Sequence, residues 1–195
     1  MNILNKALKN IFFPFFGLII LSNCGDDDPI TPPNEEELIT TVNIVFTPTS
    51  GTVVTMKYYD EDGGNGAATP VVTGGSLVSN TAYTVTLELL NESENPTEDI
   101  TEEIEEEGED HQFFFEVSSS LNLTHTSYND QDGNENPIGL KNTFTTGAAS
   151  SGTLKVILRH EPDKSAAGVS DGDITNAAGE TDIETLPAID ITIID

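Results

Sequence analysis

The chain has 195 residues, of which 34 are acidic and only seven are basic, so its formal net charge at neutral pH is −27. This charge excludes nucleic acid as a partner, because a phosphate backbone would be repelled, and it favours cations and basic surfaces. The single cysteine excludes an intramolecular disulfide, so the fold must depend on its core or on bound metal.

The first 23 residues have the composition of a secretory signal peptide. Two lysines precede an apolar run, residues 11–21, that is too short to span a bilayer stably. The run Leu21-Ser22-Asn23-Cys24 resembles the lipobox of bacterial lipoproteins. The resemblance implies cleavage after residue 23 and acylation of Cys24, with chains such as palmitate inserting into the lipid of the outer membrane.

Residues 24–37 form an acidic, proline-rich tether. Their start, Gly25-Asp26-Asp27-Asp28, resembles the tag that carries lipoproteins of Bacteroidota to the extracellular face of the outer membrane, and a merely solvated tether is the alternative. We therefore expect residues 1–23 to be a signal peptide, 24–37 a tether and 38–195 one folded domain. Without the signal peptide the chain keeps five basic and 34 acidic residues, a net charge of −29.

Short runs of alternating apolar and polar residues dominate the segment 38–195. Such runs, separated by Gly, Asn, Asp and Pro, are typical of half-buried antiparallel strands. The predicted strands are 38–46, 53–59, 83–89, 113–117, 121–123, 142–146, 154–158 and 189–193. The fold class expected is therefore all-β and mostly antiparallel, an immunoglobulin-like β-sandwich of about eight strands.

One short, very acidic helix is expected between the third and fourth strands. Asn95 is a good N-cap, Gly108 can end the helix, and Ile100 and Ile104 provide an apolar face. The segment 161–186 shows no sustained periodicity and is expected to be a long ordered excursion before the last strand, and loops of that length are often functional.

The histidines fall in phase with the apolar faces of their strands. His111 opens one strand and His160 closes another, so both lie at the same rim if these strands are antiparallel neighbours. Asp110, Glu161 and Asp163 adjoin them, and a mixed set of imidazoles and carboxylates is the kind of site that zinc or copper accepts. The alternative is that the histidines cap the core and bind loops, which is the role expected for the third histidine.

A second candidate cation site follows the fifth strand. Asp130, Asp132, Asn134 and Asn136 alternate as oxygen ligands do in calcium-binding loops, and residues 60–65 are a looser version of the same pattern. The run departs from an EF-hand loop at its sixth and twelfth positions. Asp, Asn and Gly form tight turns by themselves, so plain turns are the simpler alternative for both segments.

Four runs of the chain resemble a known family. They are Leu89-Leu90-Asn91-Glu92-Ser93-Glu94, Glu98-Asp99-Ile100-Thr101-Glu102-Glu103, His111-Gln112-Phe113-Phe114 and the segment from Leu158 to Thr175. From about residue 35 onward the chain resembles Bacteroidota lipoproteins labelled "type 1 periplasmic binding fold superfamily protein". The resemblance implies a role beside a TonB-dependent receptor. The label also implies parallel βαβ units, whereas the alternation predicts an antiparallel sandwich.

Catalytic motifs are absent from the sequence. It contains no nucleophile elbow, no zinc-protease His-Glu-x-x-His motif and no phosphate-binding glycine loop, so we do not expect an enzyme. The expected function is a lipid-anchored, non-enzymatic binding accessory of a TonB-dependent uptake system that captures a divalent metal or another cationic ligand. The alternative is a structural or adhesive surface module with calcium-stabilised loops.

Overall fold

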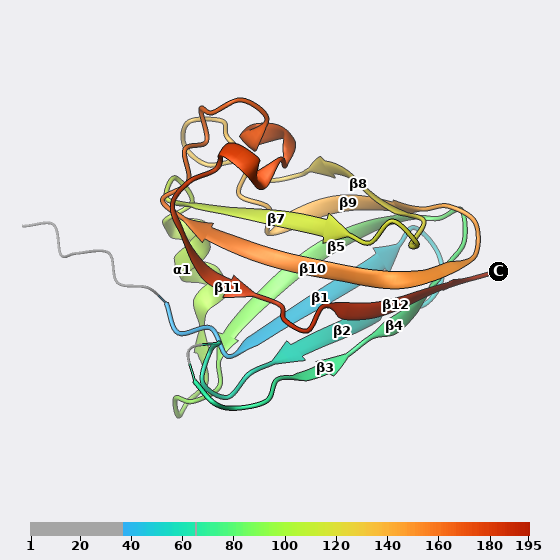
Figure 1. Cartoon of the computed structure of the whole chain (residues 1–195), viewed down its shortest axis with the longest axis horizontal. Helices are drawn as coiled ribbons and strands as arrows, with labels where there is room; N and C mark the ends of the chain where they lie inside the picture. Colours follow the sequence, from blue (N-terminus) through green and yellow to red (C-terminus); the bar gives the residue numbers. More distant parts are fainter. Residues whose placement is uncertain (1–36, 65) are drawn as a thin grey trace, which may run out of the picture. The chain divides into compact units, whose positions relative to one another are not determined.

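Two β-sheets packed face to face make up the described part of the chain, which in this computed structural model is residues 37–64 and 66–195 (Figure 1). The predicted all-β sandwich is therefore confirmed. The predicted signal peptide, Cys24 and the tether up to residue 36 lie outside the described residues. Within the described ranges, no helix is both long enough and apolar enough to cross a membrane.

The larger sheet has seven strands in the order β3-β2-β1-β5-β9-β8, with β6 paired to β5. Every pairing within it is antiparallel. Its strands are β1 (Thr41–Pro48), β2 (Val54–Tyr59), β3 (Val71–Thr73), β5 (Ala82–Asn91), β6 (Glu98–Asp99), β8 (Leu123–Tyr128) and β9 (Lys141–Thr146).

The smaller sheet has five strands arranged around a long central one, β10. One edge of β10 pairs with β7, and the other pairs with β12 along its first half and with β11 along its second half. The pairing of β12 with β4 is parallel. The strands are β4 (Gly75–Val78), β7 (His111–Val117), β10 (Ser150–His160), β11 (Glu180–Glu184) and β12 (Ile189–Ile194).

The inner faces of the two sheets share one apolar core. Along β5 and β12 every second residue is buried, as the alternation predicts. Phe46 of the larger sheet makes edge-to-face contacts with Tyr83 and Phe144, with ring centroids 5.8 and 6.0 Å away. Every core residue of the described ranges belongs to the unit Glu35–Asp195.

Seven of the eight predicted strands are present in place, the strand predicted at 121–123 runs instead over Leu123–Tyr128, and the described residues form twelve strands rather than about eight. The four additional strands, β3, β4, β6 and β11, have only two to five residues each. Alternation cannot be recognised over so few positions, because it needs several periods. One of these strands, β11, lies inside the segment that we expected to be a long excursion without strands.

The helix α1 (Ile100–Glu106) starts later than the sequence predicts. Its N-cap is Asp99, whose carboxylate accepts a hydrogen bond of 3.0 Å from the Thr101 amide. The predicted cap at Asn95 is wrong, because residues 98–99 first pair with β5 as the short strand β6. Ile100 and Ile104 are buried, as the sequence predicts.

Replacing the observed cap should therefore matter more than replacing the predicted one. We expect Asp99→Ala to lower the free energy of unfolding by about 0.5–2 kcal/mol, the usual cost of losing an N-cap side chain. Asn95→Ala is the matched control and should have a much smaller effect. Urea unfolding of both variants checks this, and equal losses would contradict the cap assignment.

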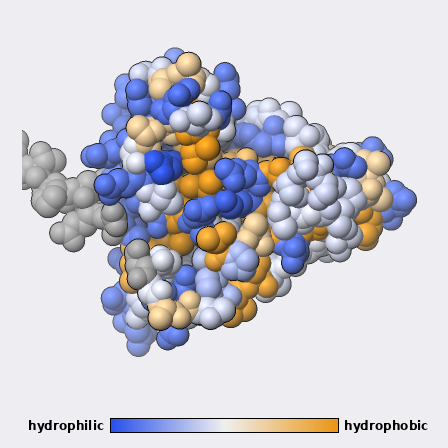
Figure 2. All heavy atoms as spheres, viewed as in Figure 1, coloured by the Kyte–Doolittle hydropathy of each residue, from blue (hydrophilic) through white to orange (hydrophobic). Residues whose placement is uncertain are grey.

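The segment 161–179 covers the outer face of the smaller sheet. It contains two short 3₁₀ turns, η1 (Val169–Asp171) and η2 (Ile174–Asn176), which lie over β7 (Figure 1). Phe114 and Ile157 point to this side and form a second small core with Val169 and Ala177. The first four residues of β7, His111 to Phe114, are therefore buried on both faces. On the face seen in Figure 2, apolar residues emerge in strips between hydrophilic ones.

Candidate metal centre

The pairing of β7 with β10 brings two histidines together. His111 opens β7 and His160 closes β10, and the antiparallel register pairs these residues directly. Their rings stack, with centroids 5.0 Å apart and an interplanar angle of 11°. Both are buried, with 0% and 7% of their surfaces exposed. The shared rim that the sequence predicts for these two residues is therefore present in the structure.

Asp182 reaches the histidines because the β10–β11 ladder contains a bulge. The register shifts between Leu158 and Arg159, and Asp182 is the extra residue at that shift. A bulge interrupts the alternation of side chains, so Asp182 and its neighbour Ile183 are both buried. The Asp182 carboxylate lies 3.6 Å from Nε2 of His111 and 3.7 Å from Nδ1 of His160.

Glu37 approaches the same nitrogen of His111 from the segment before β1. Its Oε2 lies 3.5 Å from His111 Nε2. The other ring nitrogen, Nδ1, is 3.1 Å from the carbonyl oxygen of Glu107, which can only accept a hydrogen bond. In the neutral imidazole the lone pair is therefore on Nε2, between Glu37 and Asp182. Metal-binding histidines commonly donate their second N–H to a backbone carbonyl in this way.

We refer to His111, His160, Asp182 and Glu37 as the histidine–carboxylate cluster. Its contacts of 3.5, 3.6 and 3.7 Å are close to the separation of about 3.3–3.6 Å between donor atoms in a tetrahedral zinc site. Potential ligand atoms lie within 4.8 Å of one another in two overlapping sets, which share His111. The first set is His111, His160 and Asp182, and the second is Glu37, Glu107 and His111.

The charges within the cluster affect one another strongly. Burial alone would lower the pKa of His111, but the Glu37 carboxylate, the Glu107 carbonyl and Asp182 outweigh it, and the pKa is raised above the ordinary value. Burial alone would raise the pKa of Glu37, whereas His111 lowers it. Glu37 and Asp182 bring two buried carboxylates to the cluster. Protons on the histidines or one divalent cation would compensate them.

The acidic residues that the sequence placed beside the histidines lie elsewhere. The backbones of Asp110 and Glu161 are joined by a hydrogen bond of 2.7 Å, but both side chains are exposed. Asp163 is also exposed and binds the amide and hydroxyl of Ser165. Neighbours of an inward-pointing residue in a strand point outward, so adjacency in sequence did not bring these carboxylates into the cluster.

No family model, curated protein or solved structure matches this chain. The resemblance to a lipoprotein family thus stays a prediction from the sequence. The functional interpretation of the cluster depends on its own geometry.

The predicted calcium loop is held by protein donors. Asp130 accepts hydrogen bonds of 2.9 Å from the amides of Gly139 and Lys141. Oδ1 of Asp132 accepts hydrogen bonds from the backbone amides of Asn134 and Asn136. Among the described contacts, none brings the side chain of either asparagine towards a shared ion position. These contacts explain the loop as a turn and give the calcium hypothesis no support.

A lysine occupies the inner side of this loop. Lys164 is buried, and its ammonium group donates to Oδ2 of Asp132 at 2.9 Å, to the carbonyl of Pro137 at 3.1 Å and to the carbonyl of Gly108. The loop therefore already contains a cation, supplied by the chain itself.

The third histidine, His125, has a structural environment. Its Nε2 lies 3.0 Å from Oδ1 of Asn142, and its ring packs against Phe115, Tyr128 and Phe144. Burial lowers the pKa of His125. It is therefore a suitable control residue for experiments on the other two histidines.

Proposed function

We propose that this protein is an exported, lipid-anchored binding protein that holds one divalent transition-metal ion, zinc or copper, in the histidine–carboxylate cluster. The observation that carries the proposal is the convergence of His111, Asp182 and Glu37 at 3.5–3.6 Å around a single nitrogen lone pair, beside His160. His111, His160 and Asp182 offer three donor atoms within 4.8 Å of one another, and Glu37 adds a carboxylate beside His111.

The donor set favours a transition metal over calcium. Two imidazole nitrogens suit zinc or copper, whereas calcium prefers six to eight oxygen ligands. The burial of the donors favours holding an ion over catalysis, because a catalytic metal keeps an open position for substrate. The side chains of His111 and Asp182 have no exposed surface, and those of Glu37 and His160 are 6% and 8% exposed.

Two parts of the proposal, the lipid anchor and the partnership with a receptor, are supported by the sequence. The lipobox-like run ending at Cys24 supports a lipid anchor in the outer membrane, and the acidic tag supports display to the medium. The family resemblance supports partnership with a TonB-dependent receptor. In this form of the proposal the ion is cargo that the protein delivers to the receptor for uptake.

The second candidate function is a structural or adhesive surface module in which the ion only stabilises the fold. The enclosure of all four donors favours it, because a buried ion exchanges slowly. Exchange of bound zinc for an added isotope separates the two functions. Cargo should exchange and should be released to a receptor, whereas a structural ion should do neither.

Cobalt titration of the Glu35–Asp195 unit tests the proposal. We expect one Co²⁺ per chain and the intense visible absorption of a tetrahedral site, with zinc displacing cobalt. The signal should disappear in His111→Ala/His160→Ala and persist in the matched control His125→Ala. Asp182→Asn, which preserves side-chain volume, provides the same test if the double variant does not fold. No stoichiometric binding, or binding that survives both cluster variants, would refute the proposal.

A further inference from the structure

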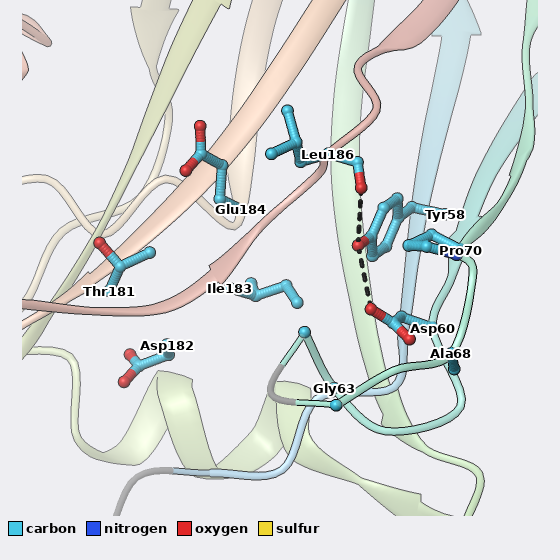
Figure 3. A pocket seen from close by; sticks show the side chains of 12 residues that line it. Tyr58, Asp60, Gly63, Ala68, Pro70, Thr181, Asp182, Ile183, Glu184 and Leu186 are labelled. Carbon is cyan, nitrogen blue, oxygen red and sulfur yellow. Dashed lines mark hydrogen bonds between the residues drawn. The ribbon is translucent and has the colours of Figure 1, made fainter.

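A cavity of about 350 Å³ lies between the turn after β2 and strand β11. Figure 3 shows Tyr58 and Asp60 on one side of it and the β11 residues Thr181–Glu184 on the other. The lining contains three acidic residues, Asp60, Asp182 and Glu184, and no basic residue, although the Asp182 carboxylate itself is turned to the histidines and is not exposed. The cavity is therefore a region of negative potential beside the histidine–carboxylate cluster, with which it shares Asp182.

Asp60 is the best-buried carboxylate on the turn side, with 3% of its surface exposed. Its Oδ2 is 3.4 Å from the Tyr58 hydroxyl, which is also 3.3 Å from the Leu186 carbonyl. One hydroxyl proton cannot serve both acceptors fully. Oδ1 of Asp60 accepts no hydrogen bond from any described residue. A buried carboxylate oxygen in this state needs a proton or a cation to compensate its desolvation.

Asp62 places a second incompletely satisfied carboxylate in the same turn. Its Oδ2 accepts a hydrogen bond of 2.9 Å from the Ala68 amide, but Oδ1 is enclosed and accepts none among the described residues. The turn closes around this side chain at Gly66, where a Cβ atom would lie 1.7 Å from Asp62 Oδ2. Burial and the neighbouring Asp62 raise the pKa of Asp60, as expected for two carboxylates competing for one proton.

We propose that Asp60, which lines this end of the cavity, and Asp62 of the same turn bind a hard divalent cation, of which Ca²⁺ is the type. The available donors are carboxylate oxygens, and an all-oxygen set selects calcium or magnesium over zinc. The contrast with the loop 130–136 supports the assignment. There Lys164 and backbone amides bind the carboxylates, whereas here two buried oxygens accept nothing from the described residues.

Terbium luminescence of the Glu35–Asp195 unit tests this site. Tb³⁺ takes the oxygen ligands of Ca²⁺, and the Tyr58 ring beside Asp60 can transfer excitation energy to it. We expect sensitised emission that saturates at one Tb³⁺ per chain, is displaced by Ca²⁺, and disappears in Tyr58→Phe while calorimetric Ca²⁺ binding persists. Asp60→Asn should weaken Tb³⁺ and Ca²⁺ binding roughly 10–100-fold or more, since loss of an outer-shell partner alone costs that much at metal sites.

The controls separate a built site from general attraction to an acidic protein. Glu61→Gln removes the same charge from an exposed position of the same turn and should leave binding unchanged. Asp62→Asn replaces Asp60→Asn if that variant does not fold. No emission from the folded protein, undiminished binding in Asp60→Asn and Asp62→Asn, or an equal loss in Glu61→Gln would overturn the proposal. Cobalt binding to the same samples reports the histidine–carboxylate cluster separately, so the two proposals can fail independently.

Discussion

Zinc at one hundred times its dissociation constant should stabilise the Glu35–Asp195 unit by about 2.7 kcal/mol. For a domain of this size, each kcal/mol raises the Tm by roughly 2–4 °C, so the expected rise is about 5–11 °C. The physical reason is that the folded chain alone brings His111, His160 and Asp182 together, with Glu37 beside His111. Differential scanning calorimetry with zinc and with a chelator, at mildly alkaline pH, measures the rise and its reversal.

The variants determine whether this stabilisation comes from the cluster. In His111→Ala/His160→Ala the zinc-dependent rise in Tm should vanish, and in His125→Ala it should be unchanged. The comparison uses the zinc-dependent difference for each variant, so any loss of stability without metal cancels. A rise of the same size in the double variant would show that zinc binds elsewhere, for instance to the exposed glutamates of α1.

Replacing Lys164 by methionine should lower the free energy of unfolding by about 3–5 kcal/mol, the cost of removing one partner of a buried ion pair. The side chain of Lys164 is 5% exposed and that of its partner Asp132 is 1% exposed. Without the ammonium group, the carboxylate and two backbone carbonyls lose their donor. Denaturant unfolding measures the loss.

Lys141→Met is the matched control for Lys164→Met. The ion pair of Lys141 with Glu105 is exposed on both sides, 52% and 57%, and such pairs contribute about 0–1 kcal/mol. Losses of similar size for the two lysines would contradict the buried-cation interpretation of the loop.

The pH dependence provides a second check on Lys164. Burial alone would raise the pKa of Asp132, but Lys164 and the amides of Asn136 and Asn134 outweigh it and lower the pKa below 3.8. A lowered folded-state pKa contributes stability that is present above the unfolded-state value and is lost as the pH falls through the folded one. The difference between wild type and Lys164→Met should therefore be complete above pH 3.8 and shrink below it.

The fold could be predicted to the extent that its strands are long enough to show alternation. Strands such as β5 and β12 bury every second residue, and the sequence shows that period directly. The short strands depend on their neighbours instead. The two residues of β6 pair with the end of β5, and this pairing moved the start of the helix from Asn95 to Ile100.

Of the four residues in the candidate metal centre, the sequence predicted the two histidines and not the two carboxylates. The alternation of apolar residues predicts that His111 and His160 point to the same face of the sheet. Their positions at the start of one strand and the end of another predict that antiparallel pairing brings them into contact, as the structure shows. Alternation could not predict the position of Asp182, because a one-residue bulge changes the face of the sheet to which its side chain points. The sequence around Asp182 contains no pattern that predicts this bulge. Glu37 was assigned to the tether on composition, and only the folded structure shows that it is almost wholly buried.

Glu37 is also the first described residue whose side chain is held by the folded domain. The predicted anchor precedes it, and the next fixed points are the buried residues Ile39 and Thr40, whose amide bonds to Leu90 just before β1. In a protein held at Cys24, tension would enter the sandwich first through the Glu37 carboxylate. A bound ion would connect Glu37 to three strands of the smaller sheet, whereas without the ion Glu37 contacts that sheet through His111 of β7.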